Sequence, residues 1–311
     1  MKKRPIICVG AAVWDSIFKV DELPDGGGKI LPKDAVQLAS GMATAAAITI
    51  ARLGGLVHFW GRIGDDANGD MYLKGLAHEG VDASCVRRVS GGRTAFSSIL
   101  VDPLGERLVV PFYDPNLDAS VDWLPLDRVS QASAVLCDMR WHRGSERLLQ
   151  AARAQGVVSV LDADVAPVDD LRRLIPLADH ILLSQPALES LSAAPGVEAK
   201  LLAMAQSVGA EVVGVTLGER GALIFERSSG AVYQVPGFNV TAVDTLNAGD
   251  AWHGAYTFGL AQGWDLLTRV QLANLAAAIK CEKFGGWRGA PTFDDLYIRA
   301  TQEGVALRVF Q

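Results

Sequence analysis

The sequence has few cysteines and no pair of them at a metal-binding or redox spacing. The four that are present, Cys8, Cys85, Cys137 and Cys281, lie far apart, so the chain contains no CxxC motif. Each lies in an apolar or mixed segment, which is typical of reduced thiols in or near a core. The histidines show neither HxH nor HxxxH spacing, which disfavours a zinc site. We therefore expect reduced cysteines in a cytoplasmic protein.

An excess of positive charge is also lacking. Lysine and arginine together number 29, against 35 aspartates and glutamates, which gives a net charge of −6. A protein that binds nucleic acid through its overall charge is basic, so we expect no nucleic-acid partner. A small anion remains a candidate ligand, because its binding depends on a few local donors rather than on net charge.

Long apolar runs and two common catalytic motifs are absent as well. The most apolar candidate, residues 42–60, contains Arg52 and a double-glycine break, short of the about 18 uninterrupted apolar residues of a membrane span. The basic first residues and the apolar run after them resemble a signal peptide, but Asp15 soon interrupts that run. The chain has neither GxxxxGK[ST] nor GxSxG, so a P-loop enzyme and a nucleophile-elbow hydrolase are not expected. We expect no membrane contact.

What the sequence does contain is enough hydrophobic residues for one large core. Half of its 311 residues are hydrophobic, which excludes global disorder. From about residue 130 onwards, apolar β-rich runs alternate with helical patterns, and this predicts a parallel sheet with helices on both faces. Shorter strand patterns interrupt the N-terminal half. We predict one α/β domain over residues 1–311, with strands from about 13–38 and 93–113 inserted as a small second sheet.

The segment from Asp244 to Ala255, DTLNAGDAWHGA, joins small residues and carboxylates at the start of a predicted helix. The first N–H groups of a helix have no partner within it, and the small Ala248 and Gly249 leave them open to an anionic oxygen. Asp250 follows in the first turn, where a carboxylate can take a proton from a hydroxyl that attacks a phosphoryl group. Taken alone, the spacing favours a simpler alternative, in which Asp244 and Asp250 only cap the helix.

This segment resembles the C-terminal signature, Asp-Thr-x-x-Ala-Gly-Asp-x-x-x-Gly, of the PfkB/ribokinase family of sugar kinases. The resemblance implies that Asp250 is the catalytic base and that Asn247, Ala248 and Gly249 form the anion hole for the transferred phosphate. The family usually has glycine in place of Asn247. Asparagine tolerates the left-handed backbone conformation better than most residues, so we expect the loop to keep its shape.

The resemblance extends over the whole chain. Near the N-terminus it is carried by Gly41 with the alanine-rich run after it, by Arg52-Leu53-Gly54, and by Gly61-Arg62-Ile63-Gly64-Asp65-Asp66-x-x-Gly69. It implies a ribokinase-like fold, with a three-layer α/β/α core, a mostly parallel sheet and a small β-sheet lid. It also implies a homodimer formed through the lid, whose strands have open edges.

The resemblance further implies which residues bind the two substrates. Asp15, whose carboxylate can accept hydrogen bonds from two hydroxyls, and Gly41 would bind the sugar. The residues that would bind ATP are Thr216, Gly218, Gly221, Asn274 and Gly286. In some members the loop that matches Gly285-Gly286-x-x-Gly289-x-Pro291 also holds a monovalent cation, which is therefore a candidate cofactor. The alternative for each glycine is a turn, and for Asp15 a strand edge.

Within the family, the chain is most similar to the sulfofructose kinases. The similarity lies in Leu23-Pro24-x-x-x-Gly28-Lys29, Gly105-Glu106-Arg107, Asp138-x-Arg140-Trp141-His142 and Leu161-Asp162-x-Asp164-x-x-Pro167. It implies that Lys29 and Arg140 hold an anionic end of the sugar, a role that an ammonium and a guanidinium suit. The alternatives are a solvated cation for Lys29 and a salt bridge to Asp138, Asp162 or Asp164 for Arg140.

Two departures leave the sugar open. Pro111 stands where the sulfofructose enzymes have a sulfonate-binding asparagine, and residues 39–42 differ from their glycine-rich run. We predict an ATP-dependent kinase that phosphorylates a primary hydroxyl of a ketose-type sugar with an anionic end, such as 6-deoxy-6-sulfofructose or a sugar phosphate. The alternatives are a neutral ketose, 2-keto-3-deoxygluconate or a nucleoside as substrate, and, in a different class, a non-catalytic sugar- or nucleotide-binding regulator on a kinase fold.

Magnesium is expected with ATP, because phosphoryl transfer requires the phosphate charge to be neutralised. Many family members have Asn-x-x-Glu at the position of Ser184-Gln185-Pro186-Ala187, so the sequence identifies no protein ligand for the metal. His253 lies one helical turn from Asp250, facing either the site or solvent, and we favour a surface or helix-packing role for it.

Overall fold

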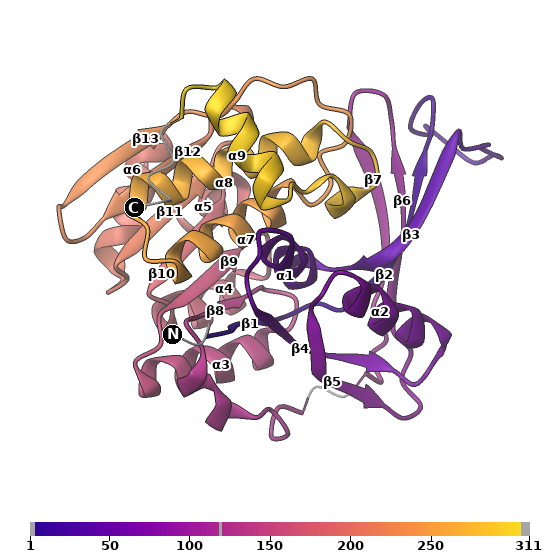
Figure 1. Cartoon of the computed structure of the whole chain (residues 1–311), viewed down its shortest axis with the longest axis horizontal. Coiled ribbons are helices and arrows are strands. Elements are labelled where there is room, and N and C mark those ends of the chain that lie inside the picture. Colours follow the sequence, from indigo (N-terminus) through magenta and orange to yellow (C-terminus); the bar gives the residue numbers. More distant parts are fainter. Residues whose placement is uncertain (1–3, 118–119, 306–311) are drawn as a thin grey trace.

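The computed structural model describes residues 4–117 and 120–305. Its centre is a nine-stranded sheet in the order β13-β12-β11-β10-β9-β8-β1-β4-β5 (Figure 1). These strands are β1 Ile6–Val9, β4 Val57–Gly64, β5 Asp82–Val89, β8 Ala134–Cys137, β9 Ser159–Ala163, β10 His180–Ser184, β11 Val212–Thr216, β12 Ala222–Glu226 and β13 Ala231–Val235. The strands from β11 to β5 are parallel, and the β12–β13 hairpin adds an antiparallel edge.

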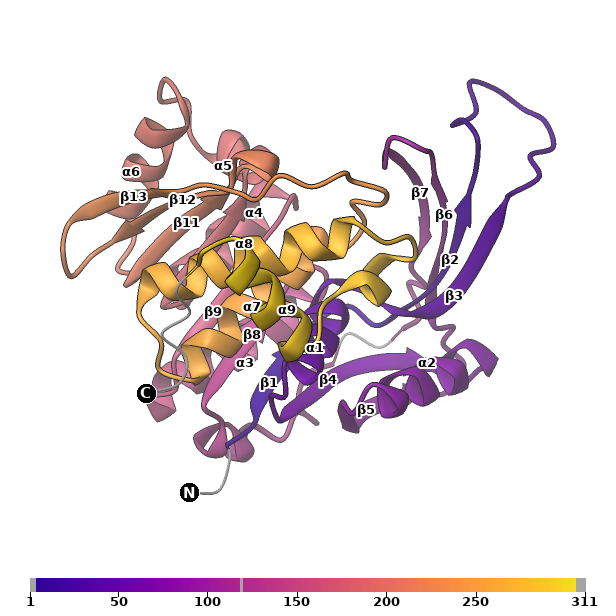
Figure 2. The ribbon, with the colours of Figure 1, turned by 45° about the horizontal axis from the view of Figure 1, so that its top comes forward.

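The side chains of this sheet enter two separate hydrophobic cores, one on each face. In β1, Ile6 and Cys8 belong to one core, whereas Ile7 and Val9 belong to the other, and all four are buried. The first core includes α1 Met42–Arg52, α2 Ala67–His78, α7 Ala248–Ala261, α8 Leu266–Cys281 and α9 Phe293–Gln302. The second includes α3 His142–Gln155, α4 Val168–Leu174, α5 Gln185–Leu191 and α6 Val197–Ser207 (Figure 2). The predicted three-layer α/β/α core is confirmed.

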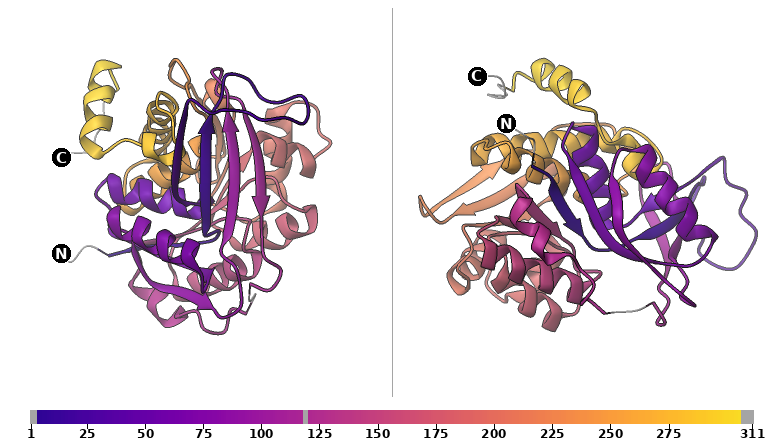
Figure 3. Two further views of the ribbon diagram at one scale, coloured as in Figure 1. Left: turned by 90° about the vertical axis from the view of Figure 1, so that its right-hand side faces the viewer. Right: turned by 60° about the horizontal axis from the view of Figure 1, so that its bottom comes forward.

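Four further strands form a second sheet, which we call the lid. It consists of β2 Val13–Lys19, β3 Asp34–Ser40, β6 Ala95–Val101 and β7 Arg107–Phe112, in the order β3-β2-β6-β7 (Figure 3). β2 pairs in parallel with β6, and the outer pairs β2–β3 and β6–β7 are antiparallel. The lid stands at one end of the core, on the right in Figure 1. Because β2 follows β1 after three residues, the chain passes directly from the central sheet into the lid.

Some elements differ from those predicted. The range of about 13–38 predicted for lid strands is interrupted, because residues 20–33 form a loop that projects from the lid (Figure 2). Strand β5 and helices α5 and α9 were not predicted. β5 lies at the edge of the sheet, where Asp82, Arg87 and Arg88 are exposed, so the strand lacks the apolar run of an interior one.

The structure also describes the thiols and the lengths of the helices. All four cysteines are free thiols, of which Cys8 and Cys137 are buried. Within residues 4–117 and 120–305, no helix combines the length and the apolar character that crossing a membrane requires.

Candidate active site

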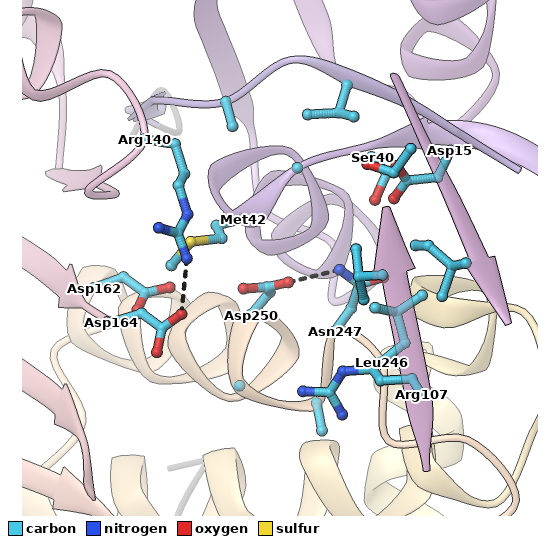
Figure 4. A pocket seen from close by; sticks show the side chains of 18 of the residues that line it. Asp15, Ser40, Met42, Arg107, Arg140, Asp162, Asp164, Leu246, Asn247 and Asp250 are labelled. Carbon is cyan, nitrogen blue, oxygen red and sulfur yellow. Dashed lines mark hydrogen bonds and ion pairs between the residues drawn. The ribbon is translucent and has the colours of Figure 1, made fainter. Parts of the chain in front are cut away.

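The carboxyl ends of the parallel strands form one edge of the central sheet, next to the lid. Asp162 is the second-last residue of β9 and Asp164 follows that strand, while Ser184 and Thr216 end β10 and β11. Ligands of α/β proteins typically bind at such an edge. These four side chains, residues of the lid and the start of α7 line a cavity of about 370 Å³ (Figure 4). Asp250 also lines this cavity, which we call the inner cavity.

The start of α7 has the open geometry that the sequence predicted. Asn247 is its N-cap and has φ 61°, the left-handed conformation in which asparagine was expected to replace glycine. The Asn247 Nδ2 donates a hydrogen bond of 2.7 Å to Oδ2 of Asp250, which fixes the carboxylate in the cavity (Figure 4). The Ala248 N–H is engaged in a turn with the Thr245 carbonyl at 3.2 Å. No heavy atom approaches within 4 Å of the place where a Cβ of Gly249 would stand, so this face of the helix start is open.

Asp250 is buried and lines the inner cavity. Its burial, followed by the negative charge of Asp162, raises its pKa to about 7, whereas the hydrogen bond from Asn247 and the charge of His253 act in the opposite direction. A general base acts best when its pKa lies near the working pH. Asp250 can therefore both hold and release a proton at neutral pH.

His253 follows Asp250 by about one turn of α7 and is only 3% exposed, so the alternative of a surface position is wrong. Its Nδ1 is 2.7 Å from the Gly249 carbonyl oxygen and 3.3 Å from Oδ2 of Asp162, and its Nε2 is 3.3 Å from the Leu182 carbonyl oxygen. Burial lowers the pKa of His253. The imidazole thus links the start of α7 to the end of β9, and it also lines the inner cavity.

The lid side of the inner cavity carries Asp15, Ser40 and Ser97. Asp15 is 5% exposed, and its Oδ1 has no hydrogen-bond partner among the described residues. Burial raises the pKa of Asp15, and the hydroxyls of Ser40 and Ser97 act against this rise. A buried carboxylate oxygen without a partner costs free energy unless a ligand hydroxyl donates to it. Gly41 lies next to this group, and a Cβ there would stand 2.3 Å from the Ala11 carbonyl oxygen.

The two cations expected at the sugar's anionic end are not together. Arg140 lines the inner cavity, but its Nη2 is 3.2 Å from Oδ2 of Asp164 and its Nη1 donates to the Val165 carbonyl oxygen at 2.8 Å (Figure 4). The salt-bridge alternative for Arg140 is therefore present in the structure. Lys29 lies in the exposed loop before β3 and is not among the residues that line the cavity.

A different arginine, Arg107 of β7, lines the cavity close to the start of α7. Its Nη1 donates to Oγ1 of Thr245 at 2.8 Å, and that hydroxyl donates to the Gly105 carbonyl oxygen at 2.9 Å. The tip of the β6–β7 hairpin thus contacts the loop that precedes Asn247. Sequence reasoning noted Arg107 only as part of a motif; the alternation of β7, in which residues 107 and 109 face inward, could have identified it.

A second cavity, of about 520 Å³, lies on the other side of α7 and holds most residues predicted for the nucleotide; we call it the outer cavity. Thr216, Gly218, Gly221 and Asn274 line it. Asn274 is held by a 2.7 Å hydrogen bond from Nε1 of Trp252 and donates to the Val235 and Pro236 carbonyls. The two cavities share Thr216, Thr245, Ala248 and Gly249, so they meet at the start of α7.

Gly286 lines neither cavity and instead supports the loop before α7. Its N–H donates to Oδ2 of Asp244 at 2.8 Å, and a Cβ at Gly286 would stand 2.6 Å from Oδ1 of Asn247. Gly286, predicted to bind the nucleotide, thus packs against the loop before α7 in this structure. Among the described residues, no group of three or more histidine, cysteine, aspartate or glutamate side chains could hold a metal ion.

Comparisons with known proteins agree with this geometry. Residues 3–292 match the model of the pfkB family carbohydrate kinases. An ATP-dependent ribose-1-phosphate kinase of Halopiger xanaduensis is 27% identical, covering 93% of this chain and 95% of its own. A fructokinase of Klebsiella pneumoniae is 29% identical, over 89% and 95% of the two chains. A crystal structure from Agrobacterium tumefaciens, provisionally named a ribokinase, has a TM-score of 0.93 and 39% identity over 97% and 98%. This chain belongs to the pfkB family of carbohydrate kinases and is an ATP-dependent sugar kinase.

Proposed function

We propose that Asp250 takes the proton from a primary hydroxyl of a ketose-type sugar as that hydroxyl attacks the γ-phosphate of ATP. The observation that carries this proposal is the meeting of two cavities at the start of α7, with Asp250 in the inner one, next to the shared Gly249. The sugar would occupy the inner cavity and the nucleotide the outer one. The whole chain would act as a single kinase domain, with the second sheet as its lid.

The chemistry of the junction suits phosphoryl transfer. The N–H group of Gly249 and the guanidinium of Arg107 would point to the place where negative charge develops, and such preorganised donors stabilise a transition state. The Ala248 N–H donates instead to the Thr245 carbonyl. Magnesium would arrive with the ATP phosphates and neutralise part of their charge. Asp162 and Asp164, at the end of β9, also line the inner cavity and would be available to the metal.

Asp15 would select and orient the sugar. Its unpartnered Oδ1 supports this role, because two neighbouring hydroxyls can satisfy both carboxylate oxygens together with Ser40 and Ser97. Gly41 would allow the sugar to approach the backbone. Proximity of the bound hydroxyl to Asp250 then supplies much of the catalysis.

We propose an anionic group at the far end of the sugar, held by Arg140. The arginine lines the inner cavity, and an incoming sulfonate, phosphate or carboxylate could exchange with Asp164 as its partner. Lys29 would join only if the loop of residues 20–33 moved inward. The pairing of Arg140 with Asp164 favours a second candidate, a neutral ketose, for which the arginine has only a structural role.

The experiment for both candidates is ADP release over a panel of sugars. The panel contains 6-deoxy-6-sulfofructose, fructose 6-phosphate, fructose, 2-keto-3-deoxygluconate and a nucleoside. The anionic-substrate proposal predicts the highest kcat/KM for one of the charged sugars. The highest value for fructose would overturn it in favour of the neutral ketose, and turnover of none would overturn the sugar-kinase mechanism itself.

We further propose a homodimer formed through the lid, in the cytoplasm. Several residues of β6 and β7 that alternate with the cavity-lining ones are apolar and exposed: Phe96 is 38% exposed, Leu108 42% and Val110 60%. A second lid would cover this face and the open edge of β7. Sedimentation of the wild type should show a dimer, and Val110→Asp should shift it to a monomer. A monomeric wild type would contradict the proposal.

A further inference from the structure

Lys280, near the end of α8, has no exposed surface. A charged side chain so deeply buried is costly unless its charge is paired and hydrogen-bonded. Its ammonium donates to the Asp244 main-chain carbonyl and lies 3.5 Å from Oδ1 of the same residue. Asp244 likewise has no exposed surface. The pair therefore lies entirely inside the protein.

Asp244 connects this ion pair to the loop before α7. Its Oδ1 accepts a hydrogen bond of 2.8 Å from the Leu246 N–H. Its Oδ2 accepts bonds of 2.9 Å and 2.8 Å from the N–H groups of Gly285 and Gly286. Asp244 thus anchors the loop that carries Asn247 and leads into the start of α7. The position of that helix start depends on a carboxylate whose charge Lys280 neutralises.

The same place is where family resemblance suggested a monovalent cation, and the residues present do not fit one. Both oxygens of Asp244 already have donors, and the ammonium holds the Asp244 carbonyl that an ion would need. The turn after α8 is tightly packed, because a Cβ at Gly289 would stand 2.4 Å from the Lys280 carbonyl oxygen. Cation sites require several oxygen ligands around an open space. Here the Lys280 side chain occupies that space, and its ammonium supplies the positive charge.

We propose that the Lys280 ammonium is a built-in internal cation that holds the loop before α7 in its active geometry, so that this kinase needs no added monovalent cation. The proposal rests on the proposed function, in which the loop at Asn247 and the start of α7 bind the transferred phosphate. Lys280 touches neither cavity, so it is a positioning residue. It acts by neutralising Asp244 and by fixing the main chain of that residue.

The first test uses the wild type alone. Its turnover is measured in potassium, ammonium and sodium chloride and in choline chloride at equal ionic strength. We expect rates within about twofold of one another, because the loop before α7 is already ordered without a bound ion. Activation of about tenfold or more by potassium or ammonium over choline would overturn the proposal.

The second test removes the ammonium. Lys280→Ala leaves room for an ion, and in choline we expect kcat to fall by about 10²-fold, as when an oxyanion-hole donor is lost. Potassium or ammonium should restore much of that loss. Lys280→Met fills the space without a charge, so it should show the loss but not the recovery. The control is Lys283→Ala, which removes an exposed lysine three residues further on. Full activity of Lys280→Ala in choline would contradict the proposal.

A measurement without turnover separates this inference from the proposed function. The midpoint of thermal unfolding should rise with potassium over choline in Lys280→Ala and stay unchanged in the wild type, because only the variant can bind the ion. If no sugar is phosphorylated but this difference appears, the proposed mechanism fails and the internal cation stands. If turnover is normal and potassium stabilises the wild type, the internal cation fails instead.

Discussion

The two sides of the inner cavity are built differently. On the core side, Asp244 accepts a hydrogen bond from the Leu246 N–H, and Asn247 donates one to Asp250. His253 contacts the Gly249 carbonyl oxygen, so the groups that would bind phosphate are held in place. On the lid side, Asp15 has an unpartnered oxygen, and the loop carrying Lys29 is exposed. The core side is preorganised for one reaction, whereas the lid side is left incomplete until a sugar binds. Changes on the core side should therefore alter kcat for any sugar, and changes on the lid side should alter KM in a sugar-dependent way.

The largest effect is expected for Asp250→Asn on the core side. Without a base, kcat should fall by about 10²-fold or more for every sugar accepted. Because burial raises the pKa of Asp250 to about 7, its charged form destabilises the fold, and stability is lost as pH rises through that value. The variant should therefore unfold at a temperature no lower than the wild type above pH 7. A loss of only a few-fold with the fold intact would show that another group is the base.

Asp15→Ala on the lid side should come next. Removing a charged acceptor for sugar hydroxyls should lower kcat/KM by about 10- to 100-fold, mainly through KM. The nucleotide's KM should not change, because Asp15 lines only the inner cavity. Asp34→Ala, at an exposed position of β3, is the matched control and should behave as the wild type. An unchanged sugar KM in Asp15→Ala would remove Asp15 from the sugar site.

Arg140→Ala should have a smaller, substrate-dependent effect. For an anionic sugar, kcat/KM should fall by about tenfold or more, because a charge-assisted hydrogen bond is lost. For a neutral sugar it should stay within about twofold, since only a partly exposed salt bridge with Asp164 and a hydrogen bond to the Val165 carbonyl are removed. Arg143→Ala, an exposed arginine at the start of α3, is the control. Equal losses for charged and neutral sugars would assign Arg140 a purely structural role.

The smallest effect at neutral pH is expected for Asp162→Asn. Where Asp162 is ionised, its negative charge raises the pKa of Asp250, so its removal should lower that pKa and extend activity to lower pH. Burial raises the pKa of Asp162 itself, which keeps the effect small. Asp169→Asn, at an exposed position of α4, should leave the profile unchanged. A shift of the acidic limb to higher pH would show that Asp162 acts on the base in another way, for example through His253.

The sequence predicted the core side of the site better than the lid side. The signature around Asp250 lies in one continuous segment, and its small residues and αL asparagine determine local geometry directly. The three-layer core followed from alternating apolar runs, since fully buried strands have an unmistakable composition. The edge strand β5 was missed because its exposed positions carry charges.

Most contacts between distant segments could not be predicted. The sequence offered the pairing of Arg140 with Asp164 only as one of three possible salt bridges. The burial of His253 against Asp162 and the contact of Arg107 with Thr245 join segments that only the fold brings together. The position of Lys29 outside the inner cavity could not be predicted either, because a motif carries no information about the path of the loop around it. The sequence shows which residue types are present, while their partners depend on the packing of the two sheets.

The most direct test of the central claim is the pH dependence of kcat/KM for the best sugar. The account predicts a rate that falls below about pH 7 with the slope of a single proton, because the pKa of Asp250 is raised to about 7 and only its deprotonated form accepts the hydroxyl proton. A rate that stays constant down to about pH 5 would contradict this assignment, since Asp250 would then titrate as an ordinary carboxylate.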